Sequence, residues 1–210
     1  MSPPAADPRF HLLKSALATG PTALSERPSP RAERMEAAVS IVIRAREDLD
    51  FLLIKRATHE RDPWSGQMAL PGGRWERQDT GLLHTARRET LEETGVNLEL
   101  HGAPLGRLDD VAPSSPRLPK MRIAPFVFGV PAQTEAMVTS HELQSVHWVP
   151  LDILRAPETA AEIKIDFPEV SRTFPSYNVV GEHVWGLTHR ILSRFLELYP
   201  ESELETLRRG

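Results

Sequence analysis

Apolar residues recur along this chain with two periods, and these predict strands and helices in alternation. Runs rich in branched and aromatic side chains predict strands over 37–43, 51–54, 121–130 and 142–149. Apolar residues three and four positions apart predict helices over 10–17, 80–94 and 185–199. Residues 98–108 are expected to form one more strand, whereas residues 157–182 show no clear period.

This order of elements places strands on both sides of a central helix, with a second helix near the end of the chain. A mixed sheet between helices would bury the apolar face of each element, so the expected fold class is α/β, arranged as an α/β/α sandwich. Within the run at 121–130, Pro125 cannot donate a ladder hydrogen bond, which predicts a sheet edge or a bulge.

The first 30 residues differ in composition from the rest of the chain. The segment 20–30 is rich in proline and serine and has the character of an extended linker. We therefore expect an N-terminal extension over 1–30 and one folded domain over 31–210. Because the linker has few apolar residues to bury, the extension is expected to add little to the stability of the domain.

Composition limits the classes of function that need to be considered. The chain has 210 residues, of which 40% are hydrophobic and 26% charged, as is typical of one globular domain. The net charge of −4 gives no basic face for nucleic acid. No apolar run is long enough to span a membrane and no signal pattern is present, so we expect a cytoplasmic protein with no membrane partner. The absence of cysteine excludes disulfides and thiolate chemistry.

The helix expected over 80–94 concentrates negative charge on one face. Glu89 and Glu93 lie one above the other, and Glu92 lies beside them. Like charges at this spacing destabilise a helix, so the stripe indicates a bound cation, and carboxylate oxygens favour Mg²⁺ or Mn²⁺. The alternative is a solvated acidic face with Arg88 as a local ion-pair partner.

Residues on either side of the acidic stripe predict where this helix begins and ends. Asp79 or Thr80 is expected to cap its N-terminus, and Gly95 to end it. Between them lie about four helical turns.

This stretch resembles the signature of the Nudix hydrolases. The residues that match directly are Arg88, Glu89, Glu92, Glu93, Gly95 and Val96. Three features depart from the signature. Thr90 stands where an aliphatic residue is usual, and Asp79 replaces the usual glutamate. One residue more than usual also separates Gly73 from the arginine.

The resemblance implies the Nudix α/β/α sandwich over 31–210 and a hydrolase of diphosphate linkages that uses Mg²⁺ or Mn²⁺. It implies that Glu89 and Glu93 bind the metal, that Arg88 orients them, and that the backbone carbonyl of Gly73 faces the metal. Glu92 is expected to be a third ligand or to hold the ligands in place.

The general base is left open by the sequence. It is either a helix carboxylate, such as Glu89 or Glu92, or a carboxylate of a later loop. Glu142, just before the strand that ends in Trp148, is the first candidate among the later residues, and Asp109 and Asp110 follow. An exposed acid at a strand edge is the alternative for Glu142.

The segment before the glycines resembles the element that marks coenzyme A pyrophosphatases within this family. The matching residues are Leu52, Leu53, Arg56, Ala57, Arg61, Gly66, Pro71, Gly72 and Gly73. Coenzyme A would give 3′,5′-ADP and 4′-phosphopantetheine, and Arg56 and Arg61 are the expected phosphate-binding residues. One extra residue precedes Gly66, Leu70 replaces a phenylalanine, and Ile54 replaces a threonine.

Other functions stay open at this point. The altered loop could favour a nucleoside triphosphate, NADH or a sugar nucleotide. A non-catalytic nucleotide-binding module would be expected to lose carboxylates from the helix, and this chain keeps all three. An isomerase of isoprenoid diphosphates would want a reactive cysteine, which is absent. The expected partner is a small nucleotide-type molecule. The sequence does not fix the oligomeric state, and a homodimer is one option.

Overall fold

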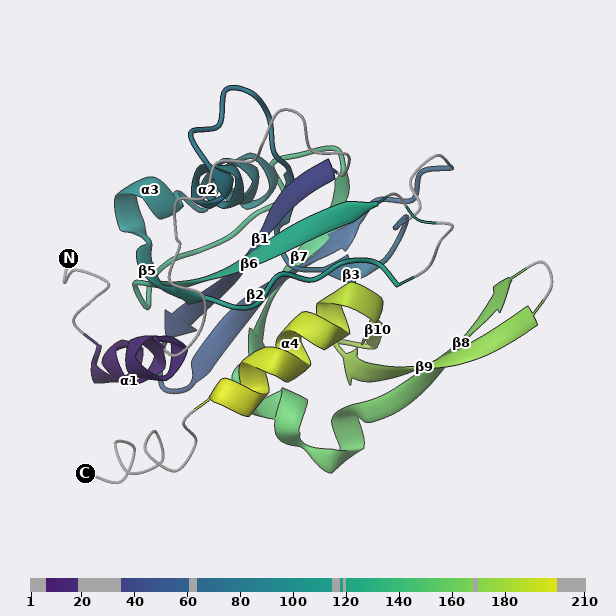
Figure 1. The fold of residues 1–210 in the computed structure, drawn as a ribbon. Coiled ribbons are helices and arrows are strands. Elements are labelled where there is room, and N and C mark those ends of the chain that lie inside the picture. Colours follow the sequence, from purple (N-terminus) through teal and green to yellow (C-terminus); the bar gives the residue numbers. More distant parts are fainter. Residues whose placement is uncertain are drawn as a thin grey trace.

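We describe a computed structural model, which covers residues 7–18, 35–60, 64–114, 118, 120–167 and 170–199. A mixed sheet lies between helix α2 (Leu82–Thr94) on one face and helices α1 (Pro8–Leu17) and α4 (Gly186–Leu198) on the other (Figure 1). This arrangement confirms the predicted α/β/α sandwich. No helix in the described part of the chain is long and apolar enough to cross a membrane.

The main sheet is built around β1 (Met35–Ala45), which lies at its centre. It pairs in parallel with β6 (Met121–Val130) and antiparallel with β2 (Leu49–Arg56). The outer strands are β5 (Ala103–Arg107), which pairs with β6, and β7 (Leu143–Pro150), which pairs with β2. Alternate residues of β1 face opposite layers: Ile41 and Ile43 pack under α1 and α4, and Ala38 and Val42 pack under α2.

β1 and β2 are paired only near the turn that joins them, where Ile43 lies opposite Phe51. Further from the turn, two short strands complete the pairing. β3 (Met68–Ala69) pairs with β2, and β4 (Gly72–Arg74) pairs with β1. The hairpin predicted from the sequence is therefore present, and its open end holds the segment that carries the two glycines.

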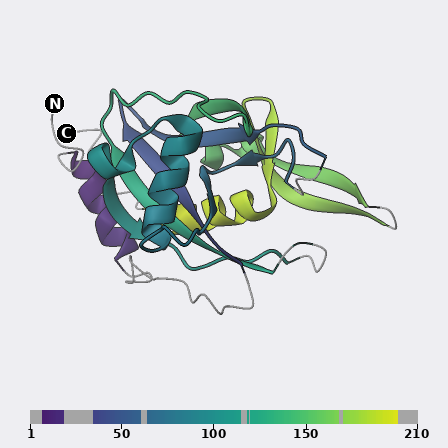
Figure 2. The same cartoon turned by 90° about the horizontal axis from the view of Figure 1, so that it is seen from above.

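A second sheet, of three strands, follows the main one along the chain. Two short 3-10 helices, η2 (Leu151–Arg155) and η3 (Pro157–Thr159), lead into β8 (Ala160–Phe167), β9 (Val170–Val179) and β10 (Glu182–Trp185). The strand order is β10-β9-β8. Figures 1 and 2 show the β8–β9 hairpin extending away from the body of the molecule. Most of this region is the segment 157–182, in which apolar residues follow no clear period.

Two local predictions need correction. Residues 98–108 form a short helix, α3 (Leu98–His101), before β5, because the Asn97 side chain accepts the Leu100 N–H at 3.0 Å and caps the helix. β6 is an interior strand and not an edge, and the bulge in its pairing with β5 lies opposite Phe128 and Val127 and not at Pro125. Pro125 lies where β5 has already ended, and its carbonyl accepts the Leu108 N–H at 3.0 Å, so its missing N–H faces a loop.

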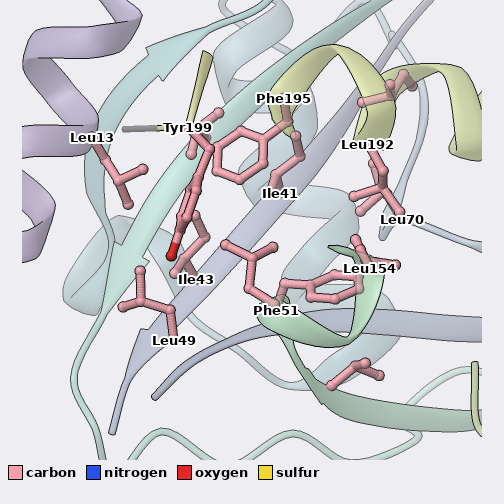
Figure 3. Packing of buried hydrophobic residues seen from close by; sticks show 14 of the residues in the cluster. Leu13, Ile41, Ile43, Leu49, Phe51, Leu70, Leu154, Leu192, Phe195 and Tyr199 are labelled. Atoms are coloured by element: carbon pink, nitrogen blue, oxygen red, sulfur yellow. The ribbon is translucent and has the colours of Figure 1, made fainter. Parts of the chain in front are cut away.

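Helix α1 is part of the core, which differs from the expectation that the extension adds little stability. Phe10, Leu13 and Leu17 are buried, and Figure 3 shows Leu13 pointing towards the cluster that contains Ile43 and Tyr199. Glycines in the sheet make this approach possible. A Cβ at Gly106 would lie 2.7 Å from Leu17, and one at Gly129 would lie 2.9 Å from Phe10. The linker over 20–30 lies outside the described residues, so the domain boundary stays a prediction.

We expect Leu13→Ala to lower the free energy of unfolding by about 2–5 kcal/mol, because it removes a fully buried side chain from a packed core. Lys14→Ala, on the exposed side of the same helix, is the matched control. Chemical denaturation of the full chain measures both. Equal stability of the two variants would show that α1 is not needed by the core.

Candidate functional site

The candidate site lies where the C-terminal half of α2 crosses the glycines of β4. α2 ends as predicted at Gly95, whose φ of 71° is left-handed and suits glycine. Its N-terminal cap is Gly81, which offers no side-chain hydrogen bond, so the prediction of Asp79 or Thr80 as the cap is wrong. The carboxylate of Asp79 is occupied elsewhere in the site.

Two adjacent glycines allow the helix to approach the sheet. A Cβ on Gly72, whose φ is 152°, would lie 2.3 Å from the carbonyl oxygen of Ala38. A Cβ on Gly73 would lie 2.4 Å from a carboxylate oxygen of Glu89. At Gly72 the atom met is backbone and φ is positive, so glycine is required there. At Gly73 a side chain would displace the Glu89 carboxylate from its place on β4. The Glu89 carboxylate therefore rests directly on the backbone of β4.

Arg88 is the centre of the charge network. Its Nε and Nη2 donate to the two oxygens of Asp79 at 2.9 and 3.0 Å. Nη1 lies 3.0 Å from Glu89 and donates to Glu92 at 3.0 Å. Nη2 also donates to the carbonyl of Arg74, at 3.0 Å. One guanidinium thus holds Glu89 and Glu92. Of the two expected metal ligands, Arg88 contacts Glu89, whereas Glu93 is held by the Gly72 N–H.

Asp79 is fully buried, and its two oxygens fix the orientation of the Arg88 guanidinium. Besides Arg88, it accepts hydrogen bonds from the Glu76 N–H, the Thr85 hydroxyl and the His84 ring. Burial would raise the pKa of Asp79, but these hydrogen bonds outweigh it and hold the pKa well below its usual range. The sequence identified Asp79 as the acid of the signature but not as the anchor of Arg88. Its spacing from the arginine was the available signal.

Glu93 is the least satisfied carboxylate of the stripe. It is only 4% exposed, and it accepts the Gly72 N–H at 2.9 Å. Burial raises its pKa to about 8, although that hydrogen bond opposes the shift. Burial also raises the pKa of Glu89, despite the adjacent charge of Arg88. A cation near these two groups would remove the cost of ionising them.

Glu142 and Arg56 approach the stripe from the sheet. The charge of Glu142 acts on both Glu89 and Glu93, and the charge of Arg56 acts on Glu93. Their backbones meet at the junction of β2 and β7, where the Ala57 N–H donates to the Glu142 carbonyl at 2.7 Å. The structure therefore brings together two residues that the sequence could only nominate separately.

The segment 131–142 holds Glu142 in this place by docking on the C-terminal end of α2. The Met137 N–H donates to the Thr94 carbonyl at 3.0 Å. Thr139 donates twice, from its N–H to the Glu93 carbonyl at 3.1 Å and from its hydroxyl to the Glu92 carbonyl at 2.8 Å. These contacts satisfy carbonyls that the helix end would otherwise leave without partners.

The remaining candidates are placed differently. The Glu92 side chain is 55% exposed and lies on the solvent side of Arg88. Asp110 forms ion pairs with Arg107 and Arg122, and Asp109 lies 3.7 Å from Arg194 of α4, so neither aspartate joins the stripe. Arg61 lies outside the described residues, and its role as a phosphate ligand stays a prediction.

The departure at Thr90 has a local explanation. Its hydroxyl donates to the carbonyl of Ala86 at 2.7 Å and contacts the hydroxyl of Ser40 on β1 at 2.8 Å. An aliphatic residue at position 90 would leave the buried Ser40 hydroxyl with fewer partners. A matched pair of hydroxyls therefore replaces the usual apolar contact between the helix and the sheet.

The donor set fits a hard divalent cation. The available groups are carboxylate and backbone oxygens, which are the ligands that Mg²⁺ and Mn²⁺ prefer. Among the described residues, no three acidic or histidine side chains are already gathered around one point. Two of the glutamates are bound to Arg88 instead. Glu89 and Glu93, beside the Gly73 backbone, are the residues that would hold such an ion.

Comparison with known proteins agrees with this geometry. The NUDIX domain family model matches residues 34–169. An uncharacterized Nudix hydrolase, NudL, from Yersinia pestis is 30% identical over 77% of this chain and 78% of its own length. An uncharacterized protein of Schizosaccharomyces pombe is 33% identical over 79% of this chain, which spans only 57% of that relative. A MutT/nudix family protein from Enterococcus faecalis, 16% identical, shares the fold with a TM-score of 0.52 over 90% of this chain and 73% of its own.

We expect the metal-free protein to lose stability as the pH rises from about 4.5 towards 8. The pKa of Glu93 is about 8 in the folded protein and 4.5 ordinarily, so the folded state binds the extra proton within this window. That stabilisation is fully present below pH 4.5 and is lost progressively as the pH rises to about 8. Glu93→Gln should reduce the slope of unfolding free energy against pH, whereas Glu92→Gln, at an exposed neighbour, should retain it. Added Mg²⁺ should stabilise the wild type more at pH 8 than at pH 5. The same slope in both variants would contradict the assignment.

Proposed function

This chain belongs to the Nudix hydrolase family. We propose that it hydrolyses a diphosphate linkage in a nucleoside diphosphate derivative with Mg²⁺ or Mn²⁺. The observation that carries the proposal is the stripe of glutamates held against Gly72 and Gly73, in which Glu93 is buried with a raised pKa. A stripe kept only for solubility would be exposed and would need no close approach of glycine.

The residues of the candidate site have separate roles in this reaction. Glu89 and Glu93, together with the Gly73 backbone, would hold the cation, with Arg88 keeping Glu89 in position and the Gly72 N–H keeping Glu93. The bound metal supplies charge neutralisation for a diphosphate that would otherwise repel a nucleophile. The oxygen of a water molecule then attacks one phosphorus, and the bond from that phosphorus to the bridging oxygen breaks. The second phosphate leaves with its half of the molecule.

We assign the general base to Glu142. The water must lose a proton as it attacks, and a carboxylate whose charge acts on both ligands is a suitable acceptor for it. Glu142 acts electrostatically on Glu89 and Glu93 but belongs to another element, so it can take the proton without giving up a metal ligand. Glu89 and Glu92 are the alternative bases on the helix.

Coenzyme A or one of its derivatives is the substrate we propose, with 3′,5′-ADP and 4′-phosphopantetheine as products. The support is the resemblance of residues 52–73 to the coenzyme A pyrophosphatase element and the charge of Arg56, which acts on Glu93. A guanidinium there suits the diphosphate itself, since arginine donates two parallel hydrogen bonds to phosphate oxygens.

A panel of coenzyme A, NADH, nucleoside triphosphates and sugar nucleotides, assayed with Mg²⁺ and with Mn²⁺, tests the proposal. We expect coenzyme A to be cleaved best, with products identified by mass. Glu93→Gln should lower turnover about a hundredfold or more, since metal-assisted charge stabilisation is worth several kcal/mol. Binding of nucleotides without turnover would identify a binding module, and preference for another diphosphate would remove the coenzyme A assignment alone.

The two arginines should affect different parts of the substrate. Arg61→Ala should weaken binding of coenzyme A more than of its 3′-dephosphorylated analogue. The loss is that of a charge-assisted contact, about 1.5–3 kcal/mol, or roughly tenfold to a hundredfold in affinity. Arg56→Ala should weaken both compounds equally, because Arg56 lies beside the metal-binding glutamates. Competition binding at matched metal concentration measures the four affinities. Equal loss for both compounds in Arg61→Ala would place Arg61 at the shared diphosphate.

A further inference from the structure

The outer edge of β8, in the β8–β9 hairpin, has no strand partner among the described residues. β8 is the outer strand of its three-stranded sheet and pairs with β9 along one side. The hairpin extends away from the body of the protein (Figures 1 and 2). The outer side of β8 therefore presents backbone donors and acceptors that can pair with another strand.

This edge lacks two devices that commonly protect a free strand. It contains no proline, and its register with β9 runs without a bulge from Ala160 to Phe167. Lysine is a third protective device, and Lys164 is present, but it lies between two acids of the same face, Glu162 and Asp166. An edge with alternating charge repels only those registers that place like charges together.

The opposite face of the hairpin is partly apolar, and it also carries Arg172, across from Ile165, and Ser176, across from Ala161. Ile163 lies across from Phe174, and Ile165 is next on the same strand face. Val170, near the tip, is 47% exposed. The Phe174 ring packs at 5.4 Å from Trp185, which connects this face to the end of β10. Covering these apolar side chains with apolar residues of another strand would remove their surface from water, which is favourable.

We propose that the β8 edges of two copies of this chain pair antiparallel about a twofold axis at Ile163. In this register Glu162 of each copy lies opposite Lys164 of the second copy, so two opposite-charge pairs form on one face. On the other face, Ile163 meets Ile163 of the second copy, and Ala161 meets Ile165. The two hairpins then form one continuous sheet, as in a self-complementary twofold interface.

Charge and overlap together select this register over its neighbours. An axis at Lys164 would place the two lysines opposite each other and Glu162 opposite Asp166, so that every charged pair would be repulsive. An axis at Ile165 would also form two opposite-charge pairs, between Lys164 and Asp166, but it would shorten the paired segment and leave Glu162 without a lysine. A shift by one residue would place apolar side chains opposite charged ones.

The pairing is expected to be weak and to leave the site of each subunit complete. Strands of this length bury less than the roughly 1,200 Å² of a standard interface, so the dimer should depend on concentration. The hairpin lies apart from α2 in the fold (Figure 1), so turnover per subunit should not change on dissociation.

Single cysteines test the register directly, because the chain has none of its own. In the proposed dimer the two copies of position 163 have Cα atoms about 4.5–5.5 Å apart, which permits a disulfide. The two copies of position 165 are about 14 Å apart, which does not. Under mild oxidation of the full chain, Ile163→Cys should form a covalent dimer much faster than Ile165→Cys. Equal rates, or the reverse order, would overturn the proposal.

Charge exchange gives the second test, with mass measured by light scattering over a range of concentrations. Lys164→Glu and Glu162→Lys should each weaken dimerisation, about tenfold, since two pairs become repulsive. The double variant should restore it, because the same pairs form with their charges exchanged. Lys14→Glu, on the exposed side of α1, makes the same change in net charge as Lys164→Glu far from the hairpin and is the control. A monomeric wild type, or a double variant no better than the single ones, would overturn the proposal, and circular dichroism would confirm that each variant is folded.

Discussion

Repulsion among the carboxylates of α2 is the constraint to which the rest of the site responds. One guanidinium, Arg88, compensates two of the glutamates, and its own orientation is fixed by the buried Asp79. Asp79 is in turn held by donors from the loop and the first turn of the helix. The third carboxylate, Glu93, accepts the Gly72 N–H and lies within the influence of the Arg56 charge, yet burial raises its pKa. The network therefore concentrates its deficit of positive charge at one place, where a divalent ion would bind.

The sheet provides the surface on which this network is built. β1 and β2 are paired only near their turn, and β3 and β4 occupy the opening between them. This insertion brings Gly72 and Gly73 under the helix, where no side chain fits between the backbone and the carboxylates. The matched hydroxyls of Thr90 and Ser40 fix the helix on β1 at the same level. The ligands are thus positioned by regular elements of the fold.

Periodicity alone was sufficient for the elements that bury one face against the core. α2, α4 and the strands β1, β2, β6 and β7 follow their predicted positions within a few residues. Periodicity gave wrong predictions where a local hydrogen bond or a contact with a distant part of the chain determines the structure. The Asn97 cap makes a helix of residues that resemble a strand, and α1 docks because glycines on β5 and β6 leave room for Phe10 and Leu17. In the site, the signature predicted the helix residues, but only the tertiary structure shows that Asp79 anchors Arg88 and that Glu142 and Arg56 share one junction.

The docking of segment 131–142 on the end of α2 decides at which step this segment loses its conformational entropy. Met137 and Thr139 are bound to helix carbonyls, and Glu142 is bound to β2, so the segment is ordered when the protein folds. The cost of ordering the backbone at Glu142 is therefore carried by the folding equilibrium and is absent from the binding of substrate. In the proposed reaction, a base carried on a backbone ordered in this way needs no loop closure to reach the site.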